Sequence, residues 1–141
     1  MTGAPAAGTK PGDTRQMVLV EDLTRTRIVQ YAGASGDYNP LHTDEVFATR
    51  AAGFPSVMAH GMLTMGMTGR LLTDWFGAGR LVSYGARFVG QVWPGDTLTA
   101  TATVTTIREE DGGAVLADLT VATRNQRGEE VLTGTATARL G

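Results

Sequence analysis

The chain divides into a first half whose apolar residues recur at helical spacing and a second half in which apolar and polar residues alternate. In residues 60–76, methionines, leucines and aromatics fall on nearly every side of a predicted helix, and such a helix is expected to be buried. About 17 residues span roughly 25 Å, and Arg70 and Asp74 interrupt the run. We therefore predict a core helix and not a membrane span.

Two shorter helices are predicted before this long one. The first begins after Thr24 as its N-cap and ends at Gly33 and Gly36. The second covers residues 43–50, with Thr43 as its N-cap. The apolar positions predicted to face inward are Ile28, Val29, Tyr31 and Ala32 in the first helix and Val46 and Phe47 in the second.

After residue 80 the period of the pattern changes to two, which is typical of strands. Strands are predicted at residues 17–20, 81–89, 97–107, from 115 to the turn at 125–129, and 131–140. The last three follow one another through short turns and form an antiparallel meander. The economical architecture is α+β: an antiparallel sheet wrapped around one long central apolar helix. We expect one domain at residues 17–141 after a flexible tail at 1–16.

Composition excludes several classes of protein. The 141 residues contain no cysteine, so disulfides and a cysteine-based zinc site are excluded. A net charge of −2 without a basic stripe argues against nucleic-acid binding. Residues 1–12 lack the apolar segment of a secretory signal, and a cytoplasmic location is expected.

Candidate chemistry concentrates between the two short helices, where Asp37 and His42 lie five residues apart. Asn39 and Pro40 between them prevent one continuous helix, because proline restricts the residue before it and lacks an N–H. A carboxylate and an imidazole on such a stiff loop can converge on one small reactant. From spacing alone the alternative stays open that Asp37 only caps a turn and His42 lies at the surface.

Three segments carry a resemblance to a known family: residues 31–42 (YAGASGDYNPLH), 59–62 (AHGM) and 93–98 (WPGDTL). The first two resemble the hydratase motif of MaoC-like proteins, the (R)-specific enoyl thioester hydratases and dehydratases of the hot-dog fold. The resemblance extends over most of the chain, from about residue 17 to 140. It is strongest to the small 3-hydroxyacyl-ACP dehydratase subunits of actinobacteria, with a stand-alone enoyl-CoA hydratase as the other possibility.

The resemblance implies a catalytic set of Asp37, His42 and Gly61, with no cofactor. Asp37 and His42 can hold one water molecule, and imidazole can accept or donate a proton near neutrality. Which of the two transfers which proton stays open. The backbone N–H of Gly61, at the start of the long helix, is the expected donor to the enolate oxygen of the thioester.

Further residues are expected to bind substrate or shape the loop, namely Ser35, Tyr38, Asn39, Pro40 and His60. Ser35 either orients Asp37 or caps the helix, and Tyr38 either lines an acyl pocket or packs in the core. Although Asp37, His42 and His60 form a two-histidine, one-carboxylate set, we expect no metal. Some family members carry a serine in the central helix that supports the aspartate; Thr68 is the candidate substitute here.

The predicted activity is (R)-specific hydration of trans-2-enoyl thioesters and the reverse dehydration of (R)-3-hydroxyacyl thioesters, by a hydro-lyase of fatty acid metabolism. The substrate would be acyl-CoA or acyl-ACP, and the resemblance implies a homodimer or a heterodimer with a second hot-dog subunit. No nucleic acid and no membrane span are expected. Two alternatives remain: a non-catalytic acyl-binding scaffold subunit, and a hot-dog acyl thioesterase.

Overall fold

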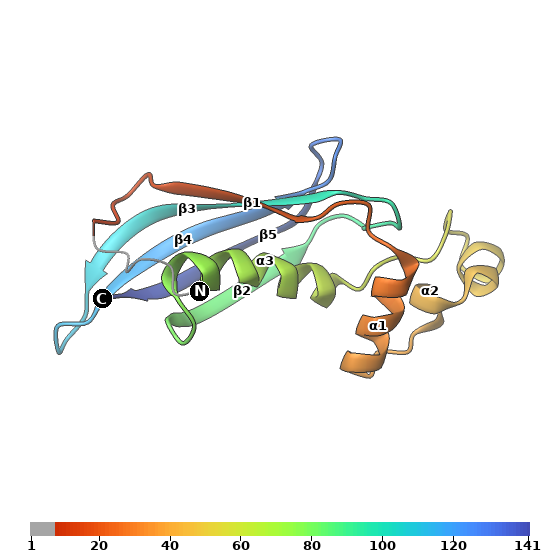
Figure 1. Cartoon of the computed structure of the whole chain (residues 1–141), viewed down its shortest axis with the longest axis horizontal. Helices are drawn as coiled ribbons and strands as arrows, with labels where there is room; N and C mark the ends of the chain where they lie inside the picture. The colour runs from red at the N-terminus through yellow and green to blue at the C-terminus, as the bar shows by residue number, and fades with distance from the viewer. Residues whose placement is uncertain (1–7) are drawn as a thin grey trace.

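A five-stranded antiparallel sheet curves along one long helix in the computed structural model, which describes residues 8–141 (Figure 1). The strands are β1 (Thr14–Val20), β2 (Leu81–Phe88), β3 (Leu98–Glu109), β4 (Val115–Arg124) and β5 (Glu130–Leu140). Their order in the sheet is β1-β3-β4-β5-β2, with all neighbours antiparallel. The predicted meander is therefore confirmed as β3-β4-β5, and β1 and β2 form the two edges.

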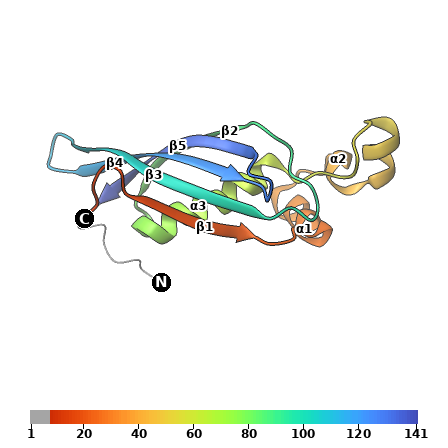
Figure 2. The ribbon, with the colours of Figure 1, turned by 90° about the horizontal axis from the view of Figure 1, so that it is seen from above.

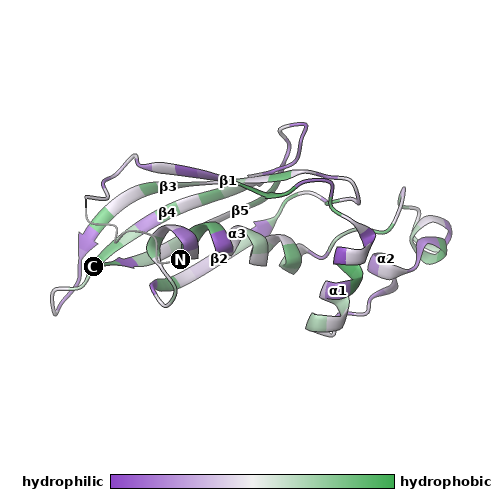
Figure 3. Ribbon diagram, viewed as in Figure 1, coloured by the Kyte–Doolittle hydropathy of each residue, from purple (hydrophilic) through white to green (hydrophobic). Residues whose placement is uncertain are grey.

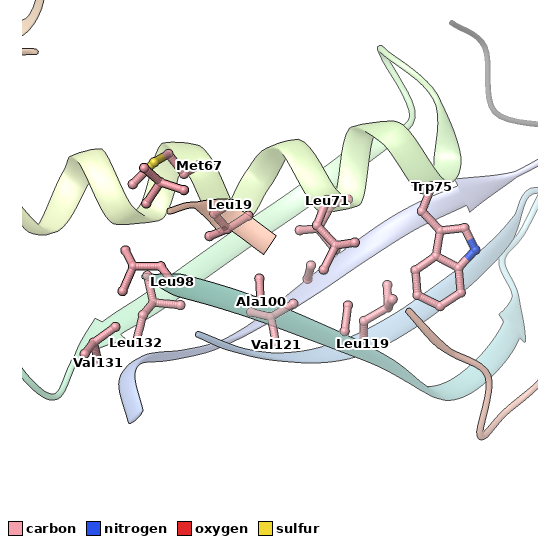
Figure 4. Packing of buried hydrophobic residues seen from close by; sticks show 14 of the residues in the cluster. Leu19, Met67, Leu71, Trp75, Leu98, Ala100, Leu119, Val121, Val131 and Leu132 are labelled. Carbon is pink, nitrogen blue, oxygen red and sulfur yellow. The ribbon is translucent and has the colours of Figure 1, made fainter. Parts of the chain in front are cut away.

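The core lies between this sheet and helix α3 (Gly61–Phe76), which runs along one face of the sheet in both views (Figures 1 and 2). Leu71 and Trp75 point from α3 toward the strands that carry Ala100 and Leu119 (Figure 4). The four inward positions predicted for β3 are all buried, namely Leu98, Ala100, Ala102 and Val104. The alternating pattern therefore predicted the inward face of β3 correctly. The small alanines on this face let the helix lie close to the sheet.

One expectation for α3 is wrong: the helix is not buried on every side. The sheet covers only its inner face, and Met62 on the outer face is 54% exposed. A shallow groove of about 610 Å³ runs along this face, between α3 and the edge strand β2. Among residues 8–141, no helix has both the length and the apolarity needed to cross a membrane.

Helix α1 (Arg25–Ser35) forms as predicted at its start, because the Thr24 hydroxyl accepts the backbone N–H of Arg27 at 3.1 Å. Only Gly36 ends it, in the left-handed conformation with φ of 76°. The helix continues through Gly33, where no such backbone turn occurs. Val29, predicted to face inward, is exposed.

The second predicted helix differs in its start and its inner face. Helix α2 (Pro40–Thr43) begins at Pro40, with Asn39 and not Thr43 as its N-cap. Proline suits a first helical position because its fixed φ is already helical and its missing N–H is not needed there. A π-helix, η1 (Phe47–Ala51), follows. Val46 and Phe47 are exposed instead of buried, and only Ala48 of η1 is buried.

The N-terminal boundary lies earlier than predicted. Strand β1 begins at Thr14, and Thr14 to Gln16 pair with Thr101 to Thr103 of β3. The prediction of a flexible tail at 1–16 is therefore wrong for residues 14–16, and residues 1–7 lie outside the described part.

Along the strands, hydrophilic and hydrophobic residues alternate, and the turn between β4 and β5 is hydrophilic (Figure 3).

Candidate active site

The predicted site residues gather at the N-terminal end of α3, where α1 and α2 extend beyond the end of the sheet (Figure 1). A pocket of about 380 Å³ opens here. Its lining residues are His42, Met58, Ala59, His60, Gly61, Thr64, Phe88, Val89, Gly90, Gln91, Val92 and Val131. The pocket therefore joins α2, the first turn of α3 and the segment that follows β2.

His42, on α2, is held in one tautomer by the backbone. Its Nδ1 lies 2.7 Å from the carbonyl oxygen of Met58, and the Met58 N–H donates to the carbonyl of Leu41 at 3.1 Å. A carbonyl oxygen can only accept, so Nδ1 carries the proton. In the neutral ring, Nε2 is then left as an acceptor.

That free Nε2 faces Asp37. The Asp37 Oδ2 atom lies 3.9 Å from Nε2 of His42, too far for a direct hydrogen bond. A water molecule at about 2.8 Å from both atoms fits this separation. The other carboxylate oxygen, Oδ1, accepts the backbone N–H of Asn39 at 3.2 Å. Two acceptors are thus presented to one small donor.

His60 lies beneath this pair and is buried. Its Nε2 donates to the backbone carbonyl of Asp37 at 3.1 Å, and its ring stacks on His42 with centroids 3.8 Å apart. Tyr31 packs edge-on against the other side at 4.7 Å. Burial, and secondarily the nearby charge of His42, lower the pKa of His60 below 6.5. A neutral His60 therefore ties the start of α3 to the loop that carries Asp37.

Asp37, His42 and His60 come together as the sequence suggested, with one donor atom of each within 4.8 Å of the others. The two imidazoles are nearly parallel, at 22°. The lone pairs of stacked rings lie in two nearly parallel planes, whereas a metal ion needs donors that converge on one point. The arrangement suits a stacked hydrogen-bonded cluster better than a metal centre.

Gly61 is the first residue of α3, so its N–H has no partner within the helix and lies at the positive end of the helix dipole. The space beside its Cα is taken by a protein side chain. A Cβ at this position would lie 2.8 Å from the ring of Phe88. Glycine is therefore required for close packing against Phe88.

The remaining predicted residues mostly shape the loop. The Ser35 hydroxyl accepts the backbone N–H of Asp37 at 3.2 Å, and the Asn39 side chain accepts the N–H of Leu41 at 3.0 Å, next to Pro40 as the first residue of α2. Tyr38 is 69% exposed, so the expectation that it packs in the core is wrong, and it is not among the residues that line this pocket.

Thr68 does not take the place of the supporting serine. It is buried, and its hydroxyl bonds that of Thr123 on β4 at 2.6 Å. Its hydroxyl is therefore committed to the sheet and not to Asp37. Asp37 is instead held through its own backbone, by Ser35 and His60.

Sequence reasoning missed most of the pocket lining, and three of the missed residues bear on the geometry of the site. Met58 acts through its backbone carbonyl, which no residue type signals. Phe88 is an ordinary apolar residue at a strand end, and only the tertiary fold places it on Gly61. Thr64 follows Gly61 by three residues and so lies on the same side of the helix, a spacing that could have identified it.

A comparison with known protein families identifies the family of this chain. The family described as MaoC like domain matches residues 6–125. The chain belongs to this family. The resemblance on which the sequence prediction rested is thereby confirmed, and with it the hot-dog fold.

Curated and solved relatives agree with this membership. The chain is 48% identical over 68 residues to the 3-hydroxyacyl-thioester dehydratase Y of Mycobacterium tuberculosis, covering 46% of this chain and 23% of that protein. Alignment thus spans about a quarter of that longer relative. The solved (R)-hydratase from A. caviae involved in PHA biosynthesis has a TM-score of 0.82 at 27% identity, covering 95% of this chain and 98% of that one.

A second solved structure is a complex of two proteins. The ChsH1-ChsH2 complex from Mycobacterium tuberculosis contains a chain with a TM-score of 0.77 and 26% identity, covering 94% of this chain and 99% of that one. The fold of the present chain is therefore found both in a named hydratase and in a named two-protein complex.

Proposed function

We propose that this MaoC-like chain is a hydro-lyase that adds water to trans-2-enoyl thioesters and, in reverse, dehydrates (R)-3-hydroxyacyl thioesters. The observation that carries the proposal is the 3.9 Å gap between Asp37 Oδ2 and His42 Nε2, beside the unpaired N–H end of α3. This geometry offers a place for one water molecule at His42 and a donor for one carbonyl oxygen at Gly61, and both residues line the same pocket.

In hydration, both O–H groups of the water are donated, one to Asp37 Oδ2 and one to His42 Nε2. The oxygen lone pairs are then free to attack C3 of the enoyl thioester. As the C3–O bond forms, one water proton passes to the Asp37/His42 pair, and a proton from the pair is delivered to C2. Water is consumed, the C2–C3 double bond is lost, and the pair returns to its starting state.

The thioester oxygen carries negative charge while C2 awaits its proton. The N–H of Gly61 is the proposed donor to that oxygen, supported by the N-terminal end of α3. His60 fixes the distance between this donor and the water site, because it is the N-cap residue directly before α3 and bonds the Asp37 carbonyl. The protein thus supplies positioning, proton transfer and charge stabilisation, and no cofactor enters the proposed step.

The proposed substrates are acyl groups carried on coenzyme A or acyl carrier protein, and the product is the (R)-3-hydroxyacyl thioester. The names of a dehydratase and an (R)-hydratase among the relatives support this substrate class and stereochemistry. The pocket beside Gly61 and Phe88 is the proposed place for the thioester and the start of the acyl chain.

We further propose that a second hot-dog chain, identical or different, pairs along β2. This strand is a sheet edge, and exposed apolar residues run along and beyond it at Val82, Phe88 and Val89. An unpaired edge is a natural site for strand addition. The adjacent groove between α3 and β2 is lined mainly by apolar surface, including Met62 and Met65, and the ChsH1-ChsH2 complex is a precedent among related folds.

The test is a spectrophotometric assay of the purified chain with crotonyl-CoA, in which loss of the enoyl absorbance reports hydration. Asp37→Asn is run beside the wild type, with a free-thiol assay in parallel. We expect rapid hydration by the wild type, no thiol release, and a rate at least about 100-fold lower in the variant, the usual scale for loss of a general acid or base.

Other results of these assays would favour a different function or a different mechanism. Thiol release without loss of the enoyl group would identify a thioesterase. No reaction with crotonyl-CoA, longer enoyl-CoA, enoyl-ACP or an added hot-dog partner would contradict the proposed activity and favour the scaffold role. Equal rates for wild type and Asp37→Asn would remove Asp37 from the mechanism.

A further inference from the structure

The hydroxyl of Thr64 is buried in the active-site pocket without a protein partner. Thr64 is 2% exposed, and its Oγ1 atom makes no hydrogen bond to any residue that the structure describes. The same residue lines the pocket together with His42, His60 and Gly61. A buried hydroxyl that remains unpaired is unfavourable, so its retention needs an explanation.

Three other threonines in helices of this chain satisfy their hydroxyls within the protein. Thr49 donates to the carbonyl of Glu45 at 2.7 Å, and Thr73 donates to the carbonyl of Arg70 at 3.3 Å. Thr68, one turn beyond Thr64 on α3, pairs with Thr123. Back-bonding to the preceding turn is the common local solution for a helical threonine. Thr64 does not adopt it, and its hydroxyl remains available to a ligand.

The position of Thr64 also relates it to the proposed oxyanion donor. It lies three residues after Gly61 on α3, and residues three apart share a helix face. Helical side chains lean toward the N-terminus, so the side chain of Thr64 covers the first turn, where the N–H of Gly61 begins the helix. Both groups belong to the lining of one pocket.

The other side-chain donors in the lining of this pocket are already engaged or exposed. The protonated ring nitrogens of His42 and His60 donate to the backbone carbonyls of Met58 and Asp37. Gln91 is exposed. A carbonyl oxygen has two lone pairs, and one N–H satisfies only one of them.

We propose that the Thr64 hydroxyl is a second hydrogen-bond donor to the thioester carbonyl oxygen, acting beside the N–H of Gly61. The inference rests on the proposed hydration activity and deepens it by naming a substrate-contacting residue. As the enolate forms, negative charge collects on this oxygen, so both hydrogen bonds strengthen in the transition state. Thr64 thereby lowers the barrier more than it tightens ground-state binding.

The test compares Thr64→Val, which keeps the shape and removes the hydroxyl, with Thr64→Ser, which keeps the hydroxyl. With crotonyl-CoA, we expect Thr64→Val to lower kcat about 10- to 100-fold while KM changes less than about fivefold, and Thr64→Ser to stay within about threefold of wild type. Thermal unfolding of Thr64→Val should occur at the wild-type temperature or above, because an unpaired buried hydroxyl is replaced by a methyl group.

Two results would overturn the inference in an active enzyme. One is a Thr64→Val variant with kcat within twofold of wild type. The other is a Thr64→Val variant that unfolds at lower temperature and is matched in activity loss by Thr64→Ser, which would show a packing role.

Calorimetric binding of butyryl-CoA, a saturated thioester, separates this inference from the proposed function. Butyryl-CoA keeps the carbonyl oxygen but cannot be hydrated. We expect Thr64→Val to bind it about two- to fivefold more weakly than wild type and Thr64→Ser to bind it equally well. If crotonyl-CoA is not hydrated but this pattern appears, the activity fails and the contact stands. Equal binding by all three proteins, or no binding by wild type, would overturn the contact.

Discussion

Two clusters of ionisable groups in this chain differ in how fully protein donors satisfy their oxygens. On the sheet, Asp118 accepts from Arg108 at 2.8 Å, from Thr106 at 2.9 Å and from Thr137 at 2.7 Å. Arg108 also donates to Glu110 at 2.8 Å. These bonds, first those from Arg108 and then that from Thr137, lower the pKa of Asp118 to about 2.

At the N-terminal end of α3, by contrast, protein donors satisfy the polar atoms only in part. Asp37 receives one backbone N–H on Oδ1, while Oδ2 faces His42 across 3.9 Å. The Thr64 hydroxyl, in the lining of the same pocket as His42, has no partner in the described residues. The Asp118 cluster, whose oxygens are bonded by protein donors, links β3, β4 and β5, whereas the Asp37 cluster leaves polar atoms free to bind a reactant. Unfilled hydrogen-bonding capacity, and not the mere gathering of charges, distinguishes the candidate site.

The largest expected effect follows from removing Nε2 of His42 while keeping its bond to Met58. In His42→Asn, the amide NH₂ stands near the position of Nδ1 and can still donate to the Met58 carbonyl. We expect hydration of crotonyl-CoA to fall about 1000-fold, within the usual range for a general acid or base, with little change in unfolding temperature. More than a tenth of the wild-type rate in this variant would show that Nε2 is not needed.

A methyl group on Gly61 should have the next largest effect. In Gly61→Ala, the Cβ would lie 2.8 Å from the Phe88 ring, so that ring must move or α3 must shift. We expect kcat/KM to fall roughly 30- to 100-fold, because the proposed oxyanion donor is displaced and its hydrogen bond is lost at least in part. The double variant Gly61→Ala/Phe88→Ala is the control. If it restores full activity, the effect arises from packing against Phe88 alone.

His60 should affect activity through position and not through proton transfer. His60→Gln places an NH₂ near the former Nε2 and can keep the bond to the Asp37 carbonyl, whereas His60→Asn is too short to reach it. We expect about tenfold lower kcat for the asparagine variant, and a smaller loss for glutamine. Equal losses in both variants would instead assign the effect to the lost ring stacking on His42.

The lowered pKa of His60 also predicts a pH dependence of stability. Above pH 6.5 both folded and unfolded chains keep this ring neutral, so it contributes no pH dependence there. Below pH 6.5 the unfolded chain takes up the proton first, and the free energy of unfolding should fall. Denaturant unfolding between pH 7 and 5 should show this decline, and His60→Gln should reduce it.

The smallest effect on activity is expected from a substitution in the Asp118 cluster. Asp118→Asn should leave crotonyl-CoA hydration unchanged but lower the unfolding temperature by about 2–4 °C, since Arg108 loses its charged acceptor. The stabilisation by the Asp118 carboxylate is present above pH 3.8 and is lost as the pH falls through about 2. In the variant, that part of the acid dependence should disappear. A change in activity would break the proposed separation of the two clusters.

Local patterns were sufficient to predict most of the elements. The alternation of Leu98 to Val104 placed β3, and the Thr24 cap with Gly36 bounded α1. Both signals act within a few residues, so they are legible in the sequence. The second helix was misplaced because two capping residues, Asn39 and Asp44, lie close together and compete with Thr43.

The chain by itself determined the order of helices and strands, the family motif and the identity of the polar residues near Asp37. Only the tertiary structure decided which atoms remain free. His42 is committed at Nδ1 by Met58, 16 residues away, and His60 is bound at Nε2 by Asp37, 23 residues away. The periodicity of the sequence shows which residues share one face of a single helix or strand. Hydrogen bonds between distant backbone and side-chain atoms depend on how the elements pack. The bond to Met58 leaves Nε2 of His42 facing Asp37, and the packing of α3 leaves the Thr64 hydroxyl unpaired in the pocket lining.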